Sequence, residues 1–588
     1  MLAALSSVFM AAPPHLVVIL ADDLGWYDTS IRNPNAPTPA IANLSASGLV
    51  LERHYVFRFC SPSRRSLLSG RLPTSITTVQ PDGDKLCSDF LPLATTTIAQ
   101  KLSSVGYACH FVGKGHLGYQ TIDHMPVNRG FATHIGYLDG AENYHHGCAT
   151  TACSADPTVG RHDLWEGDAP ATTAVPKMVY SADIYTARAV ELVEAHPVAT
   201  PFFLYFAIQN VHSPYQLPPA LQVKSYPAMG SKWHVYANML YTLDEGVHNL
   251  TAALRRHAMW EDTLMLFTAD NGGTLAFGNN YPLHGHKHDP WEGGTRATAF
   301  LAGGFVPDAL RGRRSDALVH ISDWYPTFAT LAGASPVDTP VIDGKPRPID
   351  GVNVWPLLTG ATLSQPRAIT VVTEVSAIEV AQGTAGGWRG GGGDGPRLWK
   401  LIVLAGQSNT YTMAGEQLNG TRPCLGGRQP DPPQPGRTDP IVNGPAYDEH
   451  SHACAVCNAT VPCLFDVLSD PGETTNVAAQ HRDVVARLSA AIAAANAAVY
   501  TNGTLDDEAL AAYERVAPSQ HWGGFLGPCY VKTPSTRESP VHDHSADHGA
   551  RLGCLKCCAE PEADGTCCCL VEGCPPLPPS CPAPSAAG

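Results

Sequence analysis

The sequence lacks two features that would place it in common classes of protein. No apolar run approaches the roughly 20 residues that a membrane-spanning helix requires, so we predict no membrane span. Basic residues are outnumbered, because 38 Lys and Arg stand against 53 Asp and Glu and give a formal net charge of −15. This balance argues against a general nucleic-acid binder, and recognition of an anionic substrate would need a local cluster of basic side chains.

A basic segment is also missing from residues 1–12, which are otherwise apolar with small side chains. They are interpreted either as a short signal peptide or as a packed strand. The chain is rich in cysteine, however, and 18 cysteines favour an oxidising compartment, so we expect a protein of the secretory pathway, lysosomal or extracellular. Five Asn-x-Ser/Thr sequons are compatible with secretion: Asn43, Asn249, Asn419, Asn458 and Asn502.

Four short apolar runs each end abruptly in polar residues. The runs are residues 16–20, 107–112, 202–208 and 264–268. Uninterrupted apolar strands are typical of a parallel sheet that is covered on both faces. Helical patterns at 181–195 and 234–256 lie between runs, and strands that alternate with helices predict an α/β doubly wound fold. Because such folds bind ligands at the carboxyl ends of their strands, we expect the polar endings to converge on one site.

The residues at these endings and near them are of two chemical kinds. Hard oxygen donors, which suit calcium or magnesium better than zinc, come from Asp22, Asp23, Asp270 and Asn271. Positive charge and proton transfer are supplied by Arg64, Lys114, His116, His212 and Lys287. Taken singly, each could be a turn residue, a structural histidine or a solvated lysine, so the prediction depends on all of them occurring together.

The segment from Cys60 to Arg71 reads C-x-P-S-R-x-x-L-x-[ST]-G-R. Ser61 is a good N-cap and Pro62 suits the first helical position, so we expect residue 60 at the N-terminus of a helix. Free N–H groups and the helix dipole favour an anion there. From the residues alone, a buried thiol or half of a disulfide beside a capped helix is the alternative.

This motif resembles the signature of the type I sulfatases, and the resemblance covers about residues 14–530 and is strongest toward the arylsulfatase B (N-acetylgalactosamine-4-sulfatase) branch. It is also carried by residues 21–26, 113–118, 129–131, 209–214, 270–273, 278–287, 291–294, 320–324, 350–351, 464–466 and 470–473. The resemblance implies an alkaline-phosphatase-like α/β fold. Such a fold has a large mixed, mostly parallel sheet flanked by helices, with a smaller C-terminal antiparallel sheet plus helix subdomain.

The resemblance also implies the chemistry. In that family a formylglycine-generating enzyme oxidises the cysteine during secretion, and the hydrate of the resulting aldehyde attacks sulfate esters through a covalent sulfo-enzyme intermediate. One Ca²⁺ ion would be held by Asp22, Asp23, Cys60 in its oxidised form, Asp270 and Asn271. Arg64 and Lys114 would hold the hydrate, and the substrate sulfate would meet Lys114, His212 and Lys287. His116 would take a proton from the second hydroxyl of the hydrate.

We therefore predict a calcium-dependent sulfatase acting on a sulfated carbohydrate or a small aryl sulfate. Two alternatives stay open. One is a phosphoester or phosphonate hydrolase of the same superfamily, although a single calcium with a Lys/His/Arg cluster suits sulfate better than a two-zinc site does. The other is a non-catalytic carbohydrate-binding relative in which Cys60 stays a thiol.

The predicted organisation is a catalytic domain at 13–365, a C-terminal subdomain at 366–535 and a Cys/Pro-rich tail at 536–588. The subdomain includes a Gly-rich loop at 383–396, a strand at 398–404, a Pro/Gly-rich insertion at 423–447 and a helix at about 480–499.

The cysteines are predicted to differ in their roles. The eight of the tail are expected to form disulfides, with a zinc module through Cys554 and Cys557 as the alternative. In the core we expect bridges Cys148–Cys153 and Cys87–Cys529 and a buried thiol at Cys109.

Overall fold

The structure is a computed structural model. It describes residues 13–76, 90–145, 162–171, 179–219, 232–275, 277–342, 344–381, 397–403, 457 and 461–499, all within the compact unit Met1–Lys532. Several predictions fall outside these residues: the segment 1–12, the loop 383–396, the insertion 423–447, the tail, and the bridges Cys148–Cys153 and Cys87–Cys529.

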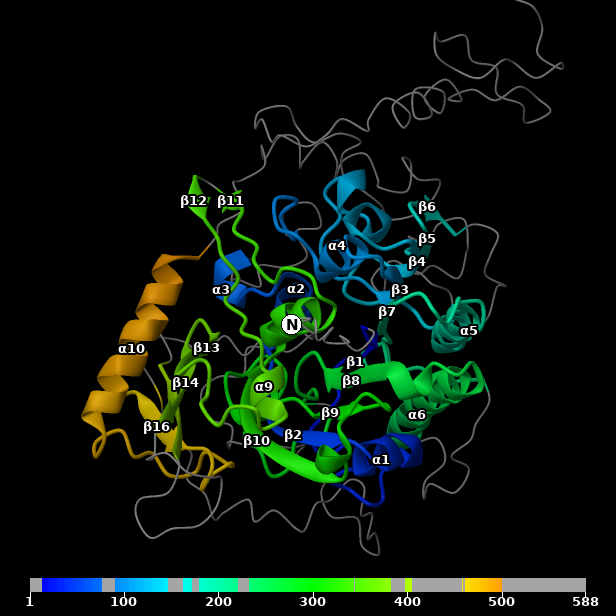
Figure 1. Ribbon diagram of the computed structural model, residues 1–588. Coiled ribbons are helices and arrows are strands. Elements are labelled where there is room, and N and C mark those ends of the chain that lie inside the picture. Colours follow the sequence, from blue (N-terminus) through cyan, green and yellow to red (C-terminus); the bar gives the residue numbers. More distant parts are fainter. Residues whose placement is uncertain are drawn as a thin grey trace, which may run out of the picture. The chain divides into compact units, whose positions relative to one another are not determined.

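Among the described residues, ten strands form one large sheet in the order β10-β2-β9-β8-β1-β7-β3-β4-β5-β6 (Figure 1). They are β1 (His15–Ala21), β2 (Leu49–Tyr55), β3 (Ala108–Lys114), β4 (Thr133–Tyr137), β5 (Trp165–Glu166), β6 (Ala169–Pro170), β7 (Phe202–Ala207), β8 (Thr263–Ala269), β9 (Ala299–Ala302) and β10 (Arg313–His320). The run β8-β1-β7-β3-β4 is parallel throughout, whereas β9 is antiparallel to both of its neighbours. Every residue of β1, β7 and β8 is buried, as predicted from their uninterrupted apolar sequences.

The larger helices form two groups that cover the sheet. One group, α1 (Pro39–Ala46), α5 (Ser181–Glu194) and α6 (Lys232–Arg256), packs together, and so does the other, α2 (Cys60–Ser69), α4 (Ile98–Ser103) and α8 (Trp324–Leu331). Both α4 and α5 contact β3. On α6, the residues Met239, Leu243, Val247, Leu250 and Leu254 are buried at helical spacing. The predicted helices at 181–195 and 234–256 are therefore confirmed.

A second, antiparallel sheet follows in the chain. It consists of β13 (Ile369–Thr373), β14 (Ser376–Ala381), β15 (Arg397–Ile402) and β16 (Cys463–Asp466). The helix α10 (Arg482–Ala497) buries Val484, Leu488 and Ile492 against this sheet, beside Leu401 and Leu464. The small sheet-plus-helix unit was predicted from the sequence, and the two sheets together confirm the predicted fold class.

The shorter elements connect these layers. They are α3 (Pro73–Ile76), α7 (Glu292–Thr295), α9 (Trp355–Leu358), β11 (Val341–Ile342), β12 (Lys345–Pro346), η1 (Ile122–His124), η2 (Pro126–Arg129), η3 (Trp260–Asp262), η4 (Asp308–Leu310) and η5 (Ile321–Asp323). A disulfide joins Cys457 to Cys463, which the sequence analysis did not assign, and Cys109 is the buried free thiol that was predicted. In the part of the chain that is described, no helix combines the length and apolar character needed to cross a bilayer.

Candidate active site

The carboxyl ends of four parallel strands meet at one edge of the large sheet, and the site is built there. Asp22 and Asp23 follow β1, Lys114 ends β3, His212 lies beyond β7, and Asp270 follows β8. Because β8, β1, β7 and β3 are adjacent in the sheet, their ends bring these residues close together. The side chains that share this edge are deeply buried, each no more than 3% exposed.

Residue 60 lies at the N-terminus of α2, but the helix begins differently from the prediction. Phe59 takes the N-cap position with extended backbone, so Cys60 is the first helical residue and Ser61 the second. The predicted N-cap at Ser61 is wrong: Pro62 is the third helical residue instead of the first, and it is tolerated there because backbone N–H groups of the first turn have no helical acceptor. The Cys60 thiol donates to Asp22 Oδ1 at 3.4 Å, and burial together with the Asp22 charge raises the pKa of that thiol.

Three buried carboxylates are paired with three buried cations. Lys114 Nζ lies 2.5 Å from Asp22 Oδ2, and Lys287 Nζ lies 2.7 Å from Asp23 Oδ1. Arg64 Nη2 lies 2.8 Å from Asp270 Oδ2 and Arg64 Nε donates to the same oxygen. The formal charges of this cluster therefore cancel. Burial acts to raise the pKa of Asp22, but Lys114 and the other nearby cations outweigh it and lower that pKa.

The two predicted histidines occupy different positions. His212 Nδ1 donates to the Ser213 carbonyl at 2.6 Å, so in the neutral ring Nε2 is an acceptor, and it lies 3.6 Å from Asp23 Oδ2. Burial lowers the pKa of His212 to about 4. His116 is half-buried, and a Cβ atom on Gly140 would lie 2.9 Å from its ring. Burial and the Lys114 charge hold the pKa of His116 well below its usual range.

Backbone strain gathers at this edge of the sheet. Asp23 has a φ of 57° and His116 a φ of 53°, which is the left-handed region that residues with a Cβ rarely adopt. Such conformations persist where the surrounding structure fixes them, and they cluster at functional sites. The strain therefore marks the same edge that the strand endings predicted.

The donor atoms of the site fit a hard cation. Asp22, Asp23, Cys60 and His212 each place one potential ligand atom within 4.8 Å of the others. Asn271 Nδ2 donates to Asp23 Oδ1 at 2.8 Å, which leaves Asn271 Oδ1 buried without a hydrogen-bond partner among the described residues. A free, buried amide oxygen beside two carboxylates is the type of ligand that calcium takes. Asp270 is less available as a metal ligand than Asp22 and Asp23, because Arg64 already binds its Oδ2.

The geometry can be compared with known proteins. The sequence profile of the sulfatase family matches residues 14–334, more than half of the 588 residues. The chain belongs to the sulfatase family. It is 32% identical over 491 residues to arylsulfatase J of Mus musculus, an alignment that covers 81% of this chain and 74% of that protein. The N-acetylgalactosamine-6-sulfatase of Mus musculus is 26% identical over 484 residues, 78% of this chain and 81% of that protein.

A solved structure supports the fold of this sulfatase independently. The crystal structure of Ps i-CgsB in complex with k-i-k-neocarrahexaose superposes with a TM-score of 0.59 at 23% identity, covering 87% of this chain and 99% of that one. The chain is thus an enzyme of the sulfatase type, which hydrolyses sulfate esters.

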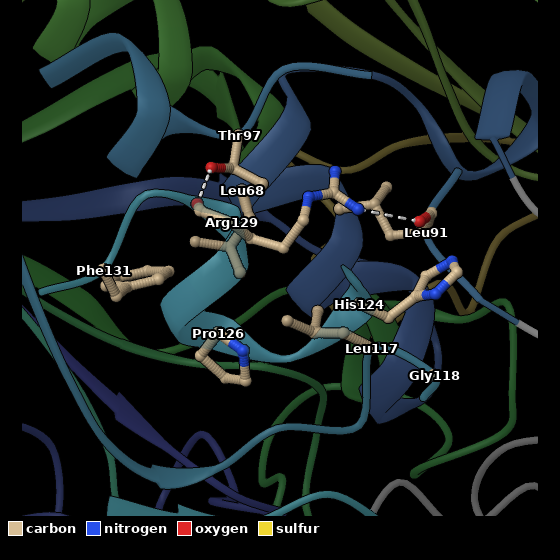
Figure 2. A pocket seen from close by; sticks show the side chains of 9 residues that line it. All are labelled: Leu68, Leu91, Thr97, Leu117, Gly118, His124, Pro126, Arg129 and Phe131. Atoms are coloured by element: carbon tan, nitrogen blue, oxygen red, sulfur yellow. Dashed lines mark hydrogen bonds between the residues drawn. The ribbon is translucent and has the colours of Figure 1, made fainter. Parts of the chain in front are cut away.

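A small cavity lies beside Arg129 and Phe131 of the 129–131 motif of the sulfatase. Its lining residues, labelled in Figure 2, are Leu68, Leu91, Thr97, Leu117, Gly118, His124, Pro126, Arg129 and Phe131. It has room for about one water molecule. The Arg129 guanidinium donates to the carbonyls of Leu91 and Thr95, and Thr97 Oγ1 donates to the Arg129 carbonyl. Arg129 therefore fixes the segment 91–97, and Leu91 of that segment donates its N–H to the carbonyl of Leu117, the residue after His116.

One group of buried ionisable residues in the sulfatase was not predicted from the sequence. Lys400, Glu292 and Glu473 are at most 1% exposed and contact one another. The available signal was a lysine in the middle of the apolar strand at 398–404, where a charge without a partner would be very costly.

Proposed function

We propose that this sulfatase hydrolyses sulfate esters of a sulfated carbohydrate, such as a glycosaminoglycan, and accepts small aryl sulfates. It does so with one Ca²⁺ ion and a formylglycine made from Cys60 by a formylglycine-generating enzyme. The observation that carries the proposal is the burial of Cys60 at a helix N-terminus, 3.4 Å from Asp22 and beside the buried cations Arg64, Lys114 and Lys287.

The charge balance of the site supports an anionic ester as substrate. The three carboxylates and three cations cancel one another, so a bound divalent cation leaves an excess of positive charge in a buried pocket. An excess charge of this kind attracts an anionic ester and stabilises the charge that develops on its oxygens. When bound, the ion would supply Lewis-acid polarisation of the sulfate, and the formylglycine hydrate would supply a hydroxyl nucleophile. Asp22, Asp23, Asn271 and residue 60 would hold the ion, with Asp270 and His212 at its edge.

The protein's own residues have separate roles in this proposal. Lys114 and Arg64 neutralise charge beside residue 60, and Lys287 binds a sulfate oxygen. His212 Nε2 faces the site beside Lys287, and one of these two residues gives the proton that the oxygen of the departing alcohol takes up. His116, which is neutral and half-buried, accepts the proton of the second hydroxyl.

Two further aspects belong to the proposal. The enzyme is placed nearest the arylsulfatase B branch of the family, and it is expected in the secretory pathway, in lysosomes or outside the cell. Asn43 and Asn249, which are exposed on α1 and α6, are accessible to glycosylation there.

The proposal is tested on protein expressed in a secretory host, with a known sulfatase from the same cells as control. Peptide mass spectrometry of residues 59–64 is expected to detect an aldehyde in place of the thiol, and the protein is expected to cleave a small aryl sulfate. A thiol in this peptide, with the control converted, would contradict the proposal and favour a non-catalytic relative. Cleavage of an aryl phosphate but not of the sulfate would favour a phosphoester hydrolase.

A further inference from the structure

A buried network of charges joins the second sheet to the segment that carries Lys287. Lys400, on β15, places its Nζ 3.0 Å from Glu292 Oε1 and 3.0 Å from Glu473 Oε1. Glu473 Oε2 also accepts a hydrogen bond from the Glu292 backbone N–H at 2.7 Å, and Tyr55 donates to Glu292 Oε2 at 3.0 Å. Taking these charges out of water costs free energy that their attraction repays only in part, so stability alone is a weak reason for the network.

The network holds α7, and α7 packs directly on the backbone around Lys287. Glu292 is the first residue of α7, and the next two are glycines. A Cβ atom on Gly293 would lie 2.2 Å from the Gly285 carbonyl oxygen, and one on Gly294 would lie 2.2 Å from the Asp289 carbonyl oxygen. The two backbones therefore touch where a side chain would collide. Since residues 285–289 include Lys287, a shift of α7 is passed to that lysine.

A second connection joins the same segment to the turn between β13 and β14. Arg58 Nη1 donates to the His288 carbonyl at 2.7 Å, and the His288 N–H donates to the Arg58 carbonyl at 2.6 Å. The Arg58 guanidinium also forms an ion pair with Glu374, which lies between β13 and β14. The residue after Lys287 is thus attached to the second sheet as well.

Two residues in these connections have strained backbones. His288 has a φ of 77° and Glu473 a φ of 53°. A residue with a Cβ keeps such a conformation only when its surroundings fix it. The strain therefore indicates that the contacts of both connections hold these backbones in place.

We propose that the second sheet is a positioning element of the active site: through Lys400, Glu473 and the Arg58–Glu374 pair it fixes residues 284–295, so that the Lys287 ammonium stays over Asp23. The proposal rests on the proposed function, because only there does Lys287 bind the substrate sulfate. Lys400 does not touch the substrate and acts through Lys287.

A double-mutant cycle tests the positioning. Lys287→Ala is expected to lower kcat on a small aryl sulfate by about 100-fold, as loss of one preorganised charge does. Lys400→Met, which keeps the length of the side chain, is expected to lower kcat by about 10-fold alone and by less than about 2-fold when Lys287 is already Ala. Arg487→Met is the matched control, because Arg487 forms an exposed ion pair with Glu379 on the same sheet and does not reach residues 284–295. Equal losses from Lys400→Met in both backgrounds would overturn the proposal.

A second measurement does not depend on activity. Lys287 is 3% exposed, and acetylation of its amine in the folded protein is expected to rise about 10-fold in Lys400→Met relative to the exposed Lys345, and to stay unchanged in Arg487→Met. If Lys400→Met fails to fold by circular dichroism, Glu473→Ala, which removes the contacts to Lys400 and to the Glu292 N–H, takes its place in both experiments. Wild-type protein that lacks sulfatase activity would contradict the proposed function only, whereas unchanged reactivity of Lys287 in the folded variants would overturn the positioning.

Discussion

His134 offers a test of how buried histidines set the acid stability of this enzyme. The ring lies on β4, 2% exposed, and its Nδ1 donates to the Gly167 carbonyl at 3.2 Å. Nε2 has no hydrogen-bond partner among the described residues, so a proton on it would create a buried N–H without an acceptor. Burial accordingly lowers the pKa of His134 from 6.5 to about 4.

The sign and size of the effect follow from proton linkage. The unfolded chain takes up a proton on this ring below about pH 6.5, whereas the folded protein does not until about pH 4. The free energy of unfolding therefore falls as the pH falls across that window, and it levels off below it. Each pKa unit corresponds to about 1.4 kcal/mol, so His134 alone removes about 2 kcal/mol between pH 7 and pH 5.

The substitution that tests this is His134→Asn, because the asparagine amide keeps a donor for Gly167 and does not titrate. Urea unfolding of wild type and variant at pH 7 and pH 5 gives four free energies of unfolding. The wild type is expected to lose about 2 kcal/mol more than the variant over this interval. His248→Asn, on an exposed ring of α6, is the control and is expected to follow the wild type. A variant that loses as much as the wild type would refute the reasoning.

Three further outcomes are expected. Cys60→Ala abolishes sulfatase turnover and leaves the circular dichroism spectrum intact, and retained turnover would rule out residue 60 as the source of the nucleophile. A calcium chelator abolishes activity, and added calcium restores it while the far-ultraviolet spectrum stays native throughout; rates that survive the chelator would remove the metal from the proposal. Leu488→Ala, which opens a cavity between α10 and the second sheet, destabilises the protein by about 3 kcal/mol, measured by urea unfolding. No measurable loss there would mean that α10 is not part of the cooperative unit.

The sequence predicts which side chains come together where the signal is local. Asp22, Lys114 and Asp270 each follow an apolar strand, and the rule that parallel strands end at one edge of the sheet is enough to bring them together. His116 was placed by the same strand ending as Lys114 and Cys60 by its motif, and the structure puts Cys60 within 3.4 Å of Asp22.

What the sequence could not give depends on contacts between distant segments. Lys400 and Glu292 are 108 residues apart, and nothing near either residue indicates the other. The start of α2 was placed too late, because a Ser-Pro pair favours one N-cap locally while the extended backbone at Phe59 fixes another. The disulfide Cys457–Cys463 was missed because, with 18 cysteines, spacing does not identify partners.

The cancellation of charge in the site has a consequence for the order in which the enzyme matures. In a small zinc module, the metal-free chain stays unfolded and folding waits for the ion. Here Lys114, Lys287 and Arg64 already neutralise the carboxylates of the cluster, so the chain can complete its fold before any ion arrives. On the proposed function, calcium loading would be a late and reversible event. The calcium level of a compartment would then set how fast existing enzyme works, and not how much folded enzyme accumulates.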